Sequence, residues 1–498
     1  MSAIFTPSQL VERVDCFARE QAESPAITHP GGTLSWAELG ERAQAIGSGL
    51  LAAGVGQGDR VVLAAAAGLD YIAAILGIAS VGAVTTPLSM MISPADARLL
   101  IDDAAPSLIL TDAAGREHLG QTIASSDLAG FGASKSGSIS TPASEISDTS
   151  PMSIIYSSGT TGLPKGIVHS IRARDAYGSH FAREYGITRQ SVTLLATAPY
   201  SNGTWMMILP TLYAGGCLVI DPDMSADGLA DTIERHDVTH CFLVPTQLAR
   251  MFDPQSPWRP TQTVTVISAG SHLPPPLKKR IVATPNVRLF ELYGNTEGVC
   301  SILRPGHMEA GFESVGTAIE GGEIAIVDAQ GKRCPIGQAG EIVGTSALIS
   351  DGYLAREELS RELEWLDEQG HRFVRSGDLG EIDVNGFLHL RGRIKDMIVT
   401  GGINVYPSDI EAQLRLHPDV LDAAVIGVAH DKWGETPCAF IETRTESGVE
   451  PMAVMEWVNT RLGKHQRISE CHLCDELPRN ALGKVVKPQL AARREAAQ

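Results

Sequence analysis

The chain of 498 residues is long enough for two or more folding units, each with its own core. Hydrophobic residues make up 43% and charged residues 20% of it, as in an ordinary soluble globular protein. Acidic side chains (58) outnumber basic ones (40), and the net charge of −18 argues against broad contact with nucleic acid or an anionic membrane, because phosphate groups attract positive charge.

The cysteines and the N-terminus indicate where the protein works. Eight cysteines are scattered along the chain, which is typical of reduced thiols, and we expect a cytoplasmic location. Cys471 and Cys474 form a lone C-x-x-C, but a zinc site needs a second pair of ligands, so we interpret them as structural. Residues 1–20 carry acidic side chains and no long apolar core, unlike a signal peptide.

One apolar stretch has to be weighed as a membrane span. Residues 71–95 carry no charge, but glycines and Pro87 interrupt them, and Asp70 and Asp96 flank them. A buried helix up to about Gly82, followed by a buried strand, explains this stretch better than a spanning helix does. We therefore expect no membrane span.

Strands alternate with helices in the chain before residue 300, and this alternation predicts a parallel, doubly wound sheet. Residues 131–150 are rich in Ser, Gly and Thr and predict a surface connection. The expected strands are 59–66, 83–87, 107–111, 191–198, 217–220, 240–244, 263–268 and 287–292, and the expected helices are 8–23, 35–53, 70–82, 94–104, 203–212 and 226–236, with a short segment at 26–34 between the first two helices.

The chain changes character from about Cys300 onward. Short alternating runs separated by glycine predict antiparallel strands in a β-rich subdomain over about residues 300–390. A last unit of mixed helices and strands follows Gly392. Its expected elements are a helix at 406–416 with Ser408 as N-cap, strands at 420–428 and 438–442, and a helix at 452–462.

The densest chemical signal is the stretch SSGTTGLPKG at 157–166, which directly follows a mostly apolar run. Glycines let backbone N–H groups turn inward, hydroxyl groups donate hydrogen bonds and Lys165 supplies a positive charge, so the stretch suits a polyphosphate. It is not a Walker loop, because Pro164 precedes the lysine and Gly166 follows it. Composition alone fits a flexible surface loop equally well.

Four motifs together resemble those of the adenylate-forming enzymes, which include acyl- and aryl-CoA ligases, luciferases and the adenylation domains of peptide synthetases. They occur in the order of that family and extend the resemblance over essentially the whole chain, so they are far more specific together than singly. The motifs are YSSGTTGLPKG at 156–166, YGNTEG at 293–298, SGDLG at 376–380 leading to GRIKDMIVTGGINVYPSDIE at 392–411, and PRNALGKVVK at 478–487.

The resemblance implies an α/β fold with a large N-terminal domain of doubly wound sheets over 1–392, which includes the β-rich subdomain, and a smaller, mobile α+β domain over 393–498. It also implies a two-step reaction. A carboxylate attacks the α-phosphorus of MgATP, giving an acyl-adenylate and pyrophosphate, and the thiol of CoA then attacks the acyl carbon and releases AMP. Because the attacking and attacked groups of the first step are both negative, positive and N–H-rich groups must surround them.

The resemblance further assigns residues to the nucleotide. The 157–166 loop would hold the β- and γ-phosphates, Thr296 the α-phosphate, and Asp378 both ribose hydroxyls. Glu297 would bind Mg²⁺, because a hard cation prefers a carboxylate. Without the resemblance, we would interpret Asp378 as a solvated aspartate in a turn. The implied ATP- and AMP-binding residues are Ser158, Gly159, Thr160, Thr161, Gly162, Lys165, Gly270, Ser271, Tyr293, Gly294, Asn295, Thr296, Asp378 and Arg393.

Lys484 matches the catalytic lysine of the C-terminal domain and would bridge the substrate carboxylate and the α-phosphate in the first step. With Thr296 and Glu297 it completes the implied catalytic set. The C-terminal domain is implied to turn at Lys395, which brings Lys484 into the site in one orientation only.

The other orientation is implied to admit CoA. The loop with Gly401 and Gly402 would then line the thiol tunnel, where glycines let the backbone pass close to pantetheine. Trp433 would stack on the CoA adenine, and a partly buried tryptophan with a structural role is an equal alternative.

The acid pocket is implied to involve the segment around Tyr200 and the strand end at Ala269. Asn202 stands roughly where many members of the family carry a gating His or aromatic residue. The candidate lining, Tyr200, Asn202, Thr204, Trp205 and Ala269, contains no charged side chain. This favours a hydrophobic or aromatic monocarboxylic acid, although the same residues fit ordinary core packing.

Three classes of function remain open at this point. The first is an acid–CoA ligase that uses a small carboxylic acid, ATP, Mg²⁺ and CoA. The second is a stand-alone adenylation enzyme that loads a carrier protein, and the third is a non-catalytic nucleotide sensor on the same fold. Lys165, Glu297, Asp378 and Lys484 argue against the sensor. A homodimer is left open.

Overall fold

The computed structural model describes residues 8–120, 123–132, 146–157, 165–255, 257–444, 448–479 and 485–497. Its mixed α/β architecture confirms the predicted fold class. The described chain contains no helix that is long and apolar enough to cross a membrane. Two compact units are present: residues 1–308, 318–323 and 344–374 form the first, and residues 309–317, 324–343 and 375–498 form the second. The boundary at 392/393 and the hinge at Lys395 stay predictions.

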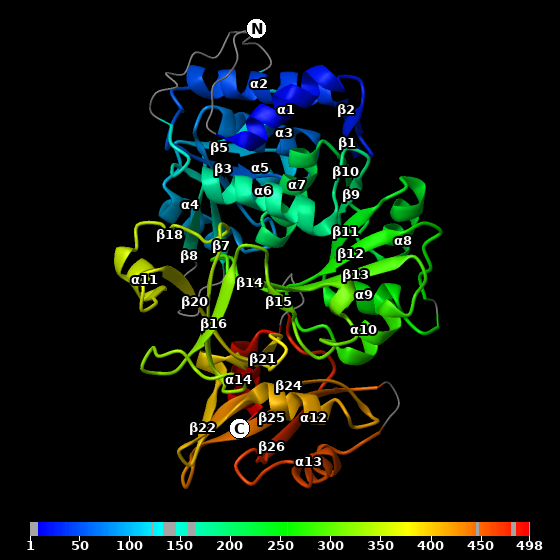
Figure 1. Ribbon diagram of the computed structural model, residues 1–498, viewed down its shortest axis with the longest axis vertical. Helices are drawn as coiled ribbons and strands as arrows, with labels where there is room; N and C mark the ends of the chain where they lie inside the picture. Colours follow the sequence, from blue (N-terminus) through cyan, green and yellow to red (C-terminus); the bar gives the residue numbers. More distant parts are fainter. Residues whose placement is uncertain are drawn as a thin grey trace. The chain divides into compact units, whose positions relative to one another are not determined.

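The first unit contains a seven-stranded sheet with the order β18-β8-β7-β4-β3-β5-β6. Helices α2 and α3 pack against each other beside it (Figure 1). Residues 71–80 of α3 are all buried, which confirms a buried helix rather than a span in the uncharged stretch. The elements are β3 (Arg60–Ala64), β4 (Val84–Pro87), β5 (Leu108–Thr111), β6 (Ser126–Asp127), β7 (Pro151–Ser157), β8 (Lys165–Ser170), β18 (Gly352–Tyr353), α2 (Trp36–Ala52), α3 (Leu69–Ser80), α4 (Pro94–Ala104), α5 (Ala113–Leu119) and α11 (Glu357–Glu362).

A nine-stranded sheet follows, with the order β15-β14-β13-β12-β11-β9-β10-β1-β2. Strands β9 to β13 and β1 pair in parallel, as predicted from the alternation, and residues 26–34 form the hairpin of β1 and β2. The elements are β1 (Pro25–His29), β2 (Gly32–Ser35), β9 (Val192–Leu195), β10 (Cys217–Ile220), β11 (His240–Leu243), β12 (Val264–Ser268), β13 (Val287–Gly294), β14 (Cys300–Leu303), β15 (Thr317–Ala318), α1 (Gln9–Glu20), α6 (Ile171–Tyr185), α7 (Asn202–Ala214), α8 (Ala226–Arg235), α9 (Pro245–Met251), α10 (Pro275–Val282) and η1 (Pro305–His307).

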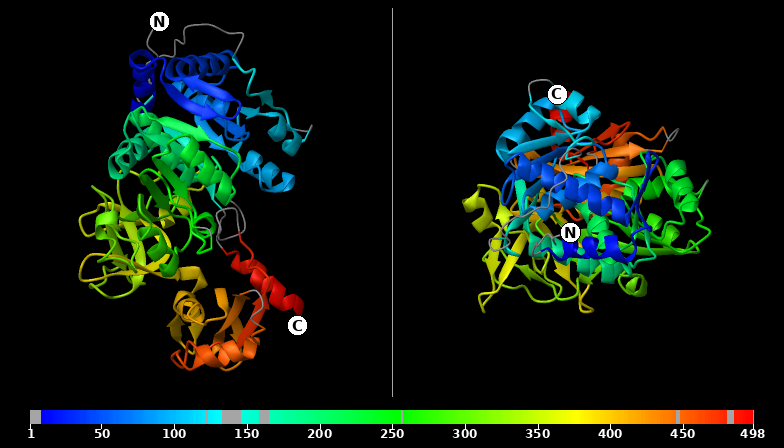
Figure 2. Two further views of the ribbon diagram at one scale, coloured as in Figure 1. Left: turned by 90° about the vertical axis from the view of Figure 1, so that its right-hand side faces the viewer. Right: turned by 90° about the horizontal axis from the view of Figure 1, so that it is seen from above.

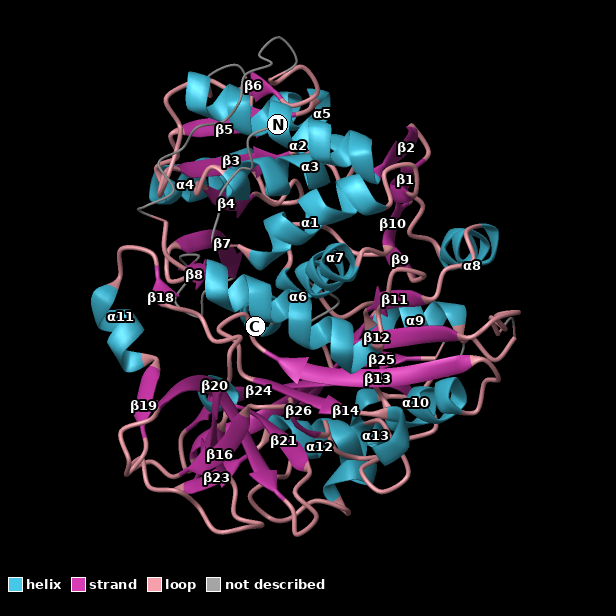
Figure 3. Ribbon diagram, turned by 45° about the horizontal axis from the view of Figure 1, so that its top comes forward, coloured by secondary structure: helices cyan, strands magenta, loops and turns pink. Residues whose placement is uncertain are grey.

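Helices α6 and α7 lie side by side (Figure 3). The N-cap of α6 is Ser170, whose hydroxyl accepts a hydrogen bond from the Ala173 N–H, and the helix ends at Gly186 with φ +75°. Tyr177, Phe181 and Tyr185 recur every four residues along its buried face, where Tyr177 meets Phe181 edge to face and Phe181 stacks on Tyr185. Helix α6 was not predicted from the sequence.

The next sheet has the order β16-β17-β20-β19 with β21 on β20, and its β19–β20 and β20–β21 pairs are antiparallel, as predicted. The last sheet has the order β23-β22-β25-β24 with β26 on β25, and the C-terminal helix α14 packs on β24 (Figure 2). The elements are β16 (Glu323–Val327), β17 (Gly340–Thr345), β19 (Glu364–Leu366), β20 (Arg372–Ile382), β21 (Leu388–Arg393), η2 (Ile394–Asp396), β22 (Ile398–Thr400), β23 (Ile403–Val405), α12 (Pro407–Leu414), β24 (Val420–His430), β25 (Gly434–Thr443), α13 (Pro451–Asn459), β26 (Glu470–Cys474) and α14 (Lys487–Ala497).

The predicted N-cap of α12 is wrong. The helix begins at Pro407 and its N-cap is Tyr406, because the fixed φ of proline suits the first helical position. Ser408 lies inside the helix, and its hydroxyl donates to the Arg391 carbonyl oxygen at 2.5 Å.

The buried His240 gives the first unit a predictable sensitivity to acid. Its Nε2 lies 3.1 Å from the Tyr185 carbonyl oxygen, and burial lowers its pKa from 6.5 to about 4. Between these two values the unfolded chain binds a proton that the folded chain does not. Stability should therefore fall by about 3 kcal/mol as the pH drops through this window.

The His240→Gln variant, whose amide can still donate to Tyr185, should lose part of this pH dependence. Denaturant midpoints at pH 7.5 and pH 5 would measure it, with the exposed His307→Gln variant as the control. An unchanged midpoint shift in His240→Gln would contradict the assignment.

Candidate active site

The predicted residues of the first unit gather where parallel strands end. Ala269, Gly270 and Ser271 follow β12, and YGNTEG begins within the neighbouring strand β13. The segment 196–205 follows β9 of the same sheet. Ligands of open α/β sheets bind at the carboxyl ends of the strands, so the fold places three predicted segments at a suitable edge.

The predicted phosphate loop joins two antiparallel strands. β7 ends at Ser157 and β8 begins at Lys165, and these two residues are partners in the ladder. Ser158, Gly159, Thr160, Thr161 and Gly162 lie outside the described residues. A strand begins at Lys165, whereas a Walker loop leads into a helix whose N-terminus faces the phosphates.

Lys165 and Glu297 meet at Tyr353, which was not predicted as a site residue from the sequence. Strand β18 pairs with β8 and brings Tyr353 beside Lys165, whose Nζ lies 4.9 Å from the centre of the tyrosine ring. The Tyr353 hydroxyl donates to Glu297 Oε1 at 2.9 Å. Burial, then the Glu297 charge, raises the pKa of Tyr353, which keeps its hydroxyl protonated as a donor. The predicted phosphate cation and the predicted metal ligand therefore share one neighbour.

Asn295 closes the turn of YGNTEG. Its backbone N–H donates to the Val299 carbonyl oxygen at 3.1 Å, and its Oδ1 accepts from the Val299 N–H at 2.9 Å. Gly298, with φ +105°, lies so close to the chain at 348–349 that a Cβ would stand 2.6 Å from Leu348 O. His169 Nε2 lies 2.9 Å from the Thr296 carbonyl oxygen and supports the turn from β8. Tyr293 and Gly294 form the end of β13 beside this turn.

The acid-pocket candidates divide into two groups. Thr204 and Trp205 are buried, and their polar atoms donate to the carbonyl oxygens of Ala198 and Pro199. Ala269 is also buried, whereas Tyr200 and Asn202 are partly exposed. Thr204 and Trp205 therefore support the wall of the predicted acid pocket from inside the protein. Tyr200 and Asn202 have side-chain atoms that can reach a ligand.

None of these candidates is charged, but a charged side chain lies directly against them in the structure. Arg174 of α6 is 0% exposed, and its Nη1 donates to Asn202 Oδ1 at 2.8 Å. Its guanidinium also lies 4.7 Å from the Trp205 ring centre. Arg174 was missed because α6 was not predicted and because arginine is seldom fully buried.

In the second unit, the predicted ribose ligand Asp378 is mostly buried, and its Oδ1 lies 3.0 Å from Arg393 Nε. Both residues are partners across β20 and β21, so the hairpin itself brings them together. The Asp378 N–H donates to the Ser376 hydroxyl at 3.0 Å, which fixes the backbone of the SGDLG motif. Lys395 follows in η2.

The predicted CoA residues form one cluster. Gly401 and Gly402 have φ of +60° and +80° and make the tight turn between β22 and β23. The Gly401 N–H donates to the Trp433 carbonyl oxygen at 2.8 Å. The ammonium groups of Lys432 and Lys464 lie 4.9 and 5.7 Å from the Trp433 ring centre. A flat aromatic ring with two lysines beside it suits an adenine that carries phosphates.

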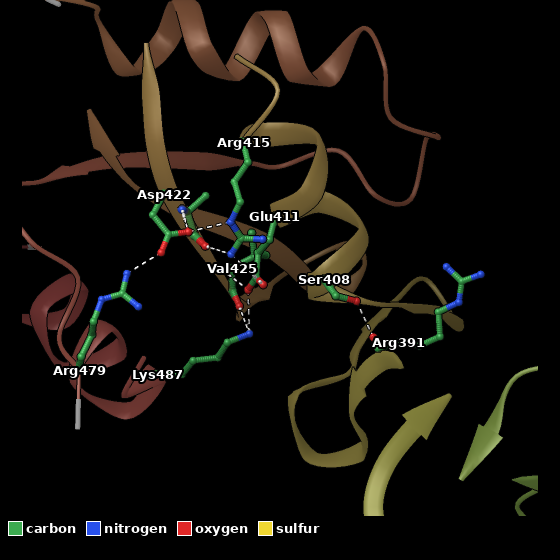
Figure 4. A network of polar contacts seen from close by, with 9 residues as sticks. Arg391, Ser408, Glu411, Arg415, Asp422, Val425, Arg479 and Lys487 are labelled. Carbon is green, nitrogen blue, oxygen red and sulfur yellow. Dashed lines mark hydrogen bonds and ion pairs between the residues drawn. The ribbon is translucent and has the colours of Figure 1, made fainter. Parts of the chain in front are cut away.

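Lys484 lies outside the described residues, but both sides of its loop are anchored in the second unit. Arg479 and Val485 form an antiparallel bridge, and Arg479 pairs with Asp422 of β24. Lys487 Nζ donates to Glu411 Oε1 at 3.0 Å and to the Val425 carbonyl oxygen at 2.9 Å (Figure 4). These contacts hold the described residues on either side of 480–484 within the second unit.

The side chains around β26 do not support a further metal centre among the described residues. Cys471 and Cys474 lie three residues apart on β26, so their thiols face opposite sides of the strand, as expected for structural cysteines. Cys438, Glu470 and His472 have ligand atoms within 4.8 Å of one another. Glu470, however, accepts hydrogen bonds from Arg494 through both oxygens, at 2.8 and 2.7 Å, so the carboxylate is already neutralised by the guanidinium.

Comparison with known proteins identifies the class. The family model of the AMP-binding enzyme matches residues 14–354, and that of the AMP-binding enzyme C-terminal domain matches residues 409–484. The chain therefore belongs to the AMP-binding enzyme family. This confirms the predicted resemblance to adenylate-forming enzymes.

Individual relatives align over nearly the whole chain. The indoleacetate–CoA ligase of Aromatoleum aromaticum is 29% identical over 98% of this chain and 99% of its own. The sulfoacetate–CoA ligase of Cupriavidus necator is 28% identical over 95% of both chains. The o-succinylbenzoate CoA synthetase of Bacillus subtilis, solved with its acyl-adenylate intermediate, superposes with a TM-score of 0.85 at 26% identity over 97% of this chain and 98% of that one. The chain is thus similar along its length to acid–CoA ligases.

Proposed function

We propose that the protein is an ATP-dependent ligase that joins a hydrophobic or aromatic monocarboxylic acid to CoA through an acyl-adenylate. The observation that carries the proposal is the convergence of Lys165, Tyr353, Glu297 and the Thr296 turn, to which Arg174 and His169 link Asn202. The free state of all eight cysteines supports a reducing, cytoplasmic location.

In the first step, the chain holds two negative reactants in contact. Lys165 and the Thr296 turn bind the phosphates, and Lys484 bridges the acid carboxylate and the α-phosphate. One carboxylate oxygen forms a bond to the α-phosphorus, the bond to the bridging oxygen breaks, and pyrophosphate leaves. Positive groups lower the repulsion between the reactants and stabilise the charge of the transition state.

Glu297 fits the Mg²⁺ that such nucleotides carry. Its Oε1 accepts from Tyr353 alone, so the carboxylate is oriented without being neutralised by a cation among the described residues. When bound, the ion would neutralise phosphate charge.

In the second step, the CoA thiol attacks the acyl carbon and AMP leaves. Asp378 accepts hydrogen bonds from the ribose hydroxyls, since a carboxylate offers two acceptor oxygens. Gly401 and Gly402 line the path of the pantetheine, and Trp433 with its two lysines receives the nucleotide end of CoA.

A panel of acids tests the proposal. Benzoates, phenylpropanoids, indoleacetate, fatty acids and sulfoacetate would each be added with ATP, Mg²⁺ and CoA, and AMP would be measured. We expect AMP to form in proportion to CoA consumed, fastest with an apolar aromatic acid. Pyrophosphate release without CoA consumption would indicate a carrier-loading enzyme, and ATP binding without turnover would indicate a sensor. Preference for a dianionic acid would overturn the substrate class.

Replacing Trp433 with alanine should weaken CoA binding. We expect the KM for CoA to rise roughly 5- to 30-fold, the range for losing one stacking and cation–π contact of about 1–2 kcal/mol. Pyrophosphate release in the absence of CoA should stay unchanged. Initial rates at varied CoA would measure the effect, and an equal loss in both steps would show that Trp433 is structural instead.

A further inference from the structure

Arg174 is a fully buried cation. None of the carboxylates that the structure describes forms an ion pair with it, although it is 0% exposed. Burial lowers its pKa to about 10, so the guanidinium stays protonated at neutral pH. Removing a charge from water costs several kcal/mol unless other groups compensate. The burial of this charge beside the predicted acid pocket therefore calls for a functional explanation.

Neutral groups occupy the hydrogen-bonding directions of Arg174. Its Nε donates to the Ser153 hydroxyl of β7 at 2.7 Å, Nη1 to Asn202 Oδ1 at 2.8 Å, and Nη2 to His169 Nδ1 at 3.2 Å. The rings of Tyr177 and Trp205 lie 4.9 and 4.7 Å from the guanidinium carbon. These dipoles and ring faces stabilise the charge without cancelling it.

The same contacts determine the orientation of the Asn202 amide and the tautomer of His169. Arginine can only donate, so Asn202 must turn its oxygen to Arg174, and its Nδ2 then donates to the Tyr177 hydroxyl at 3.0 Å. His169 must accept at Nδ1, so its Nε2 carries the hydrogen and donates to the Thr296 carbonyl oxygen at 2.9 Å. Burial and the Arg174 charge hold the pKa of His169 well below 6.5, so the ring stays neutral.

A continuous chain of hydrogen bonds therefore runs from Asn202, on the acid side, through Arg174 and His169 to the backbone of Thr296, on the nucleotide side. All four residues belong to the first unit. Both reactants that should meet at its two ends, a carboxylate and a phosphate, are anions. Either anion carries the charge opposite to that of Arg174, which has no carboxylate partner among the described residues.

We propose that Arg174 is a positioning residue of the adenylation step, which holds Asn202 and, through His169, the Thr296 turn in one arrangement and keeps its own charge uncompensated for the anionic acid and nucleotide. The second N–H of the Asn202 amide then donates to the acid carboxylate. The inference rests on the proposed function. It predicts that acid and nucleotide assist each other's binding and that this assistance depends on Arg174.

Four variants test it: Arg174→Met, Arg174→Lys, Asn202→Asp and, as a control on the exposed side of the same helix, Arg172→Met. For each, acid affinity would be measured by calorimetry with and without a non-hydrolysable ATP analogue, together with the thermal midpoint and pyrophosphate release. In Arg174→Met we expect the analogue to lose its effect on acid affinity and adenylation kcat/KM to fall roughly 100-fold. Arg174→Lys, which keeps the charge but not the fork of donors, should recover part of kcat/KM.

Asn202→Asp separates positioning from packing, because it supplies the missing counter-ion. We expect its thermal midpoint to rise while the KM for the acid increases roughly tenfold or more, since the new carboxylate repels the substrate. A purely structural Arg174 would give higher stability with an unchanged acid KM, and that result would overturn the inference. So would a folded Arg174→Met protein with unchanged coupling.

The remaining outcomes are also decisive. If Arg174→Met does not fold, the acid affinity and acid KM of Arg174→Lys and Asn202→Asp are compared with those of the wild type instead. If the wild-type protein binds acid and nucleotide but releases no pyrophosphate with any acid, the proposed function fails, whereas the binding coupling still supports or overturns the role of Arg174. An Arg172→Met protein as impaired as Arg174→Met would show that α6 responds to any such change, which would also overturn the inference.

Discussion

The Lys484→Ala protein should lose the first step of the reaction and keep the second. We expect pyrophosphate release to fall roughly 100- to 1,000-fold, which is the effect of removing one group that stabilises developing charge. Lys484 is proposed to bridge two anions only while the acyl–phosphate bond forms. A preformed acyl-adenylate no longer needs that bridge, so its conversion to acyl-CoA should proceed at nearly the wild-type rate.

Both half-reactions would be measured on the same preparation, with the exposed Lys332→Ala variant as a control for the loss of a cation in the second unit. The anchors of the loop, Arg479 and Lys487, are retained in the variant, so the chain on either side should keep its place. Equal losses of rate in both half-reactions would contradict the proposed role of Lys484 in the first step.

Much of the architecture could be predicted because its signal is local. The buried strands and helices before residue 300 alternate in the sequence, and parallel pairing follows from that alternation. The turn at Gly401-Gly402 likewise needs positive φ, which glycine alone adopts freely. Ser408 shows the limit of local rules, since a preceding proline decided where α12 begins.

The helix α6 was missed although its sequence carries a signal. Tyr177, Phe181 and Tyr185 have helical spacing after the capping Ser170, but Arg174 and Asp175 interrupt the apolar face. Both charged residues are buried in the structure for reasons that lie far along the chain. Asp175 accepts from the N–H groups of Gln9 and Leu10 at the start of α1, and Arg174 is held by Ser153 and Asn202.

The motifs themselves were found, but the residue that connects them was not. Tyr353 reaches Lys165 and Glu297 only because β18 pairs with β8, and strand pairing between such distant segments leaves no trace in a single sequence. The role of Arg174 could not be predicted for the same reason, because its partners Ser153 and Asn202 lie far from it in the sequence. A motif predicts which groups touch the substrate, whereas the groups that orient them depend on tertiary contacts.

The Glu297→Gln protein should show the second large effect, and it should depend on metal concentration. Glutamine keeps the shape of the side chain and can still accept from the Tyr353 hydroxyl, so the turn should be preserved. It loses the negative charge that a hard cation prefers. We expect adenylation at low Mg²⁺ to fall roughly 100-fold or more, with partial recovery as Mg²⁺ is raised.

Pyrophosphate release would be followed across a Mg²⁺ titration for the wild type, Glu297→Gln and Tyr353→Phe. The last variant keeps the carboxylate but removes the hydroxyl that orients it, so we expect a loss of roughly tenfold or less and a Mg²⁺ dependence close to the wild type. Binding of AMP without metal should be similar in all three proteins. If Glu297→Gln instead kept the wild-type Mg²⁺ dependence, the ion would have to be held elsewhere, and the Lys165–Tyr353–Glu297 cluster would serve only to close the site around the phosphates.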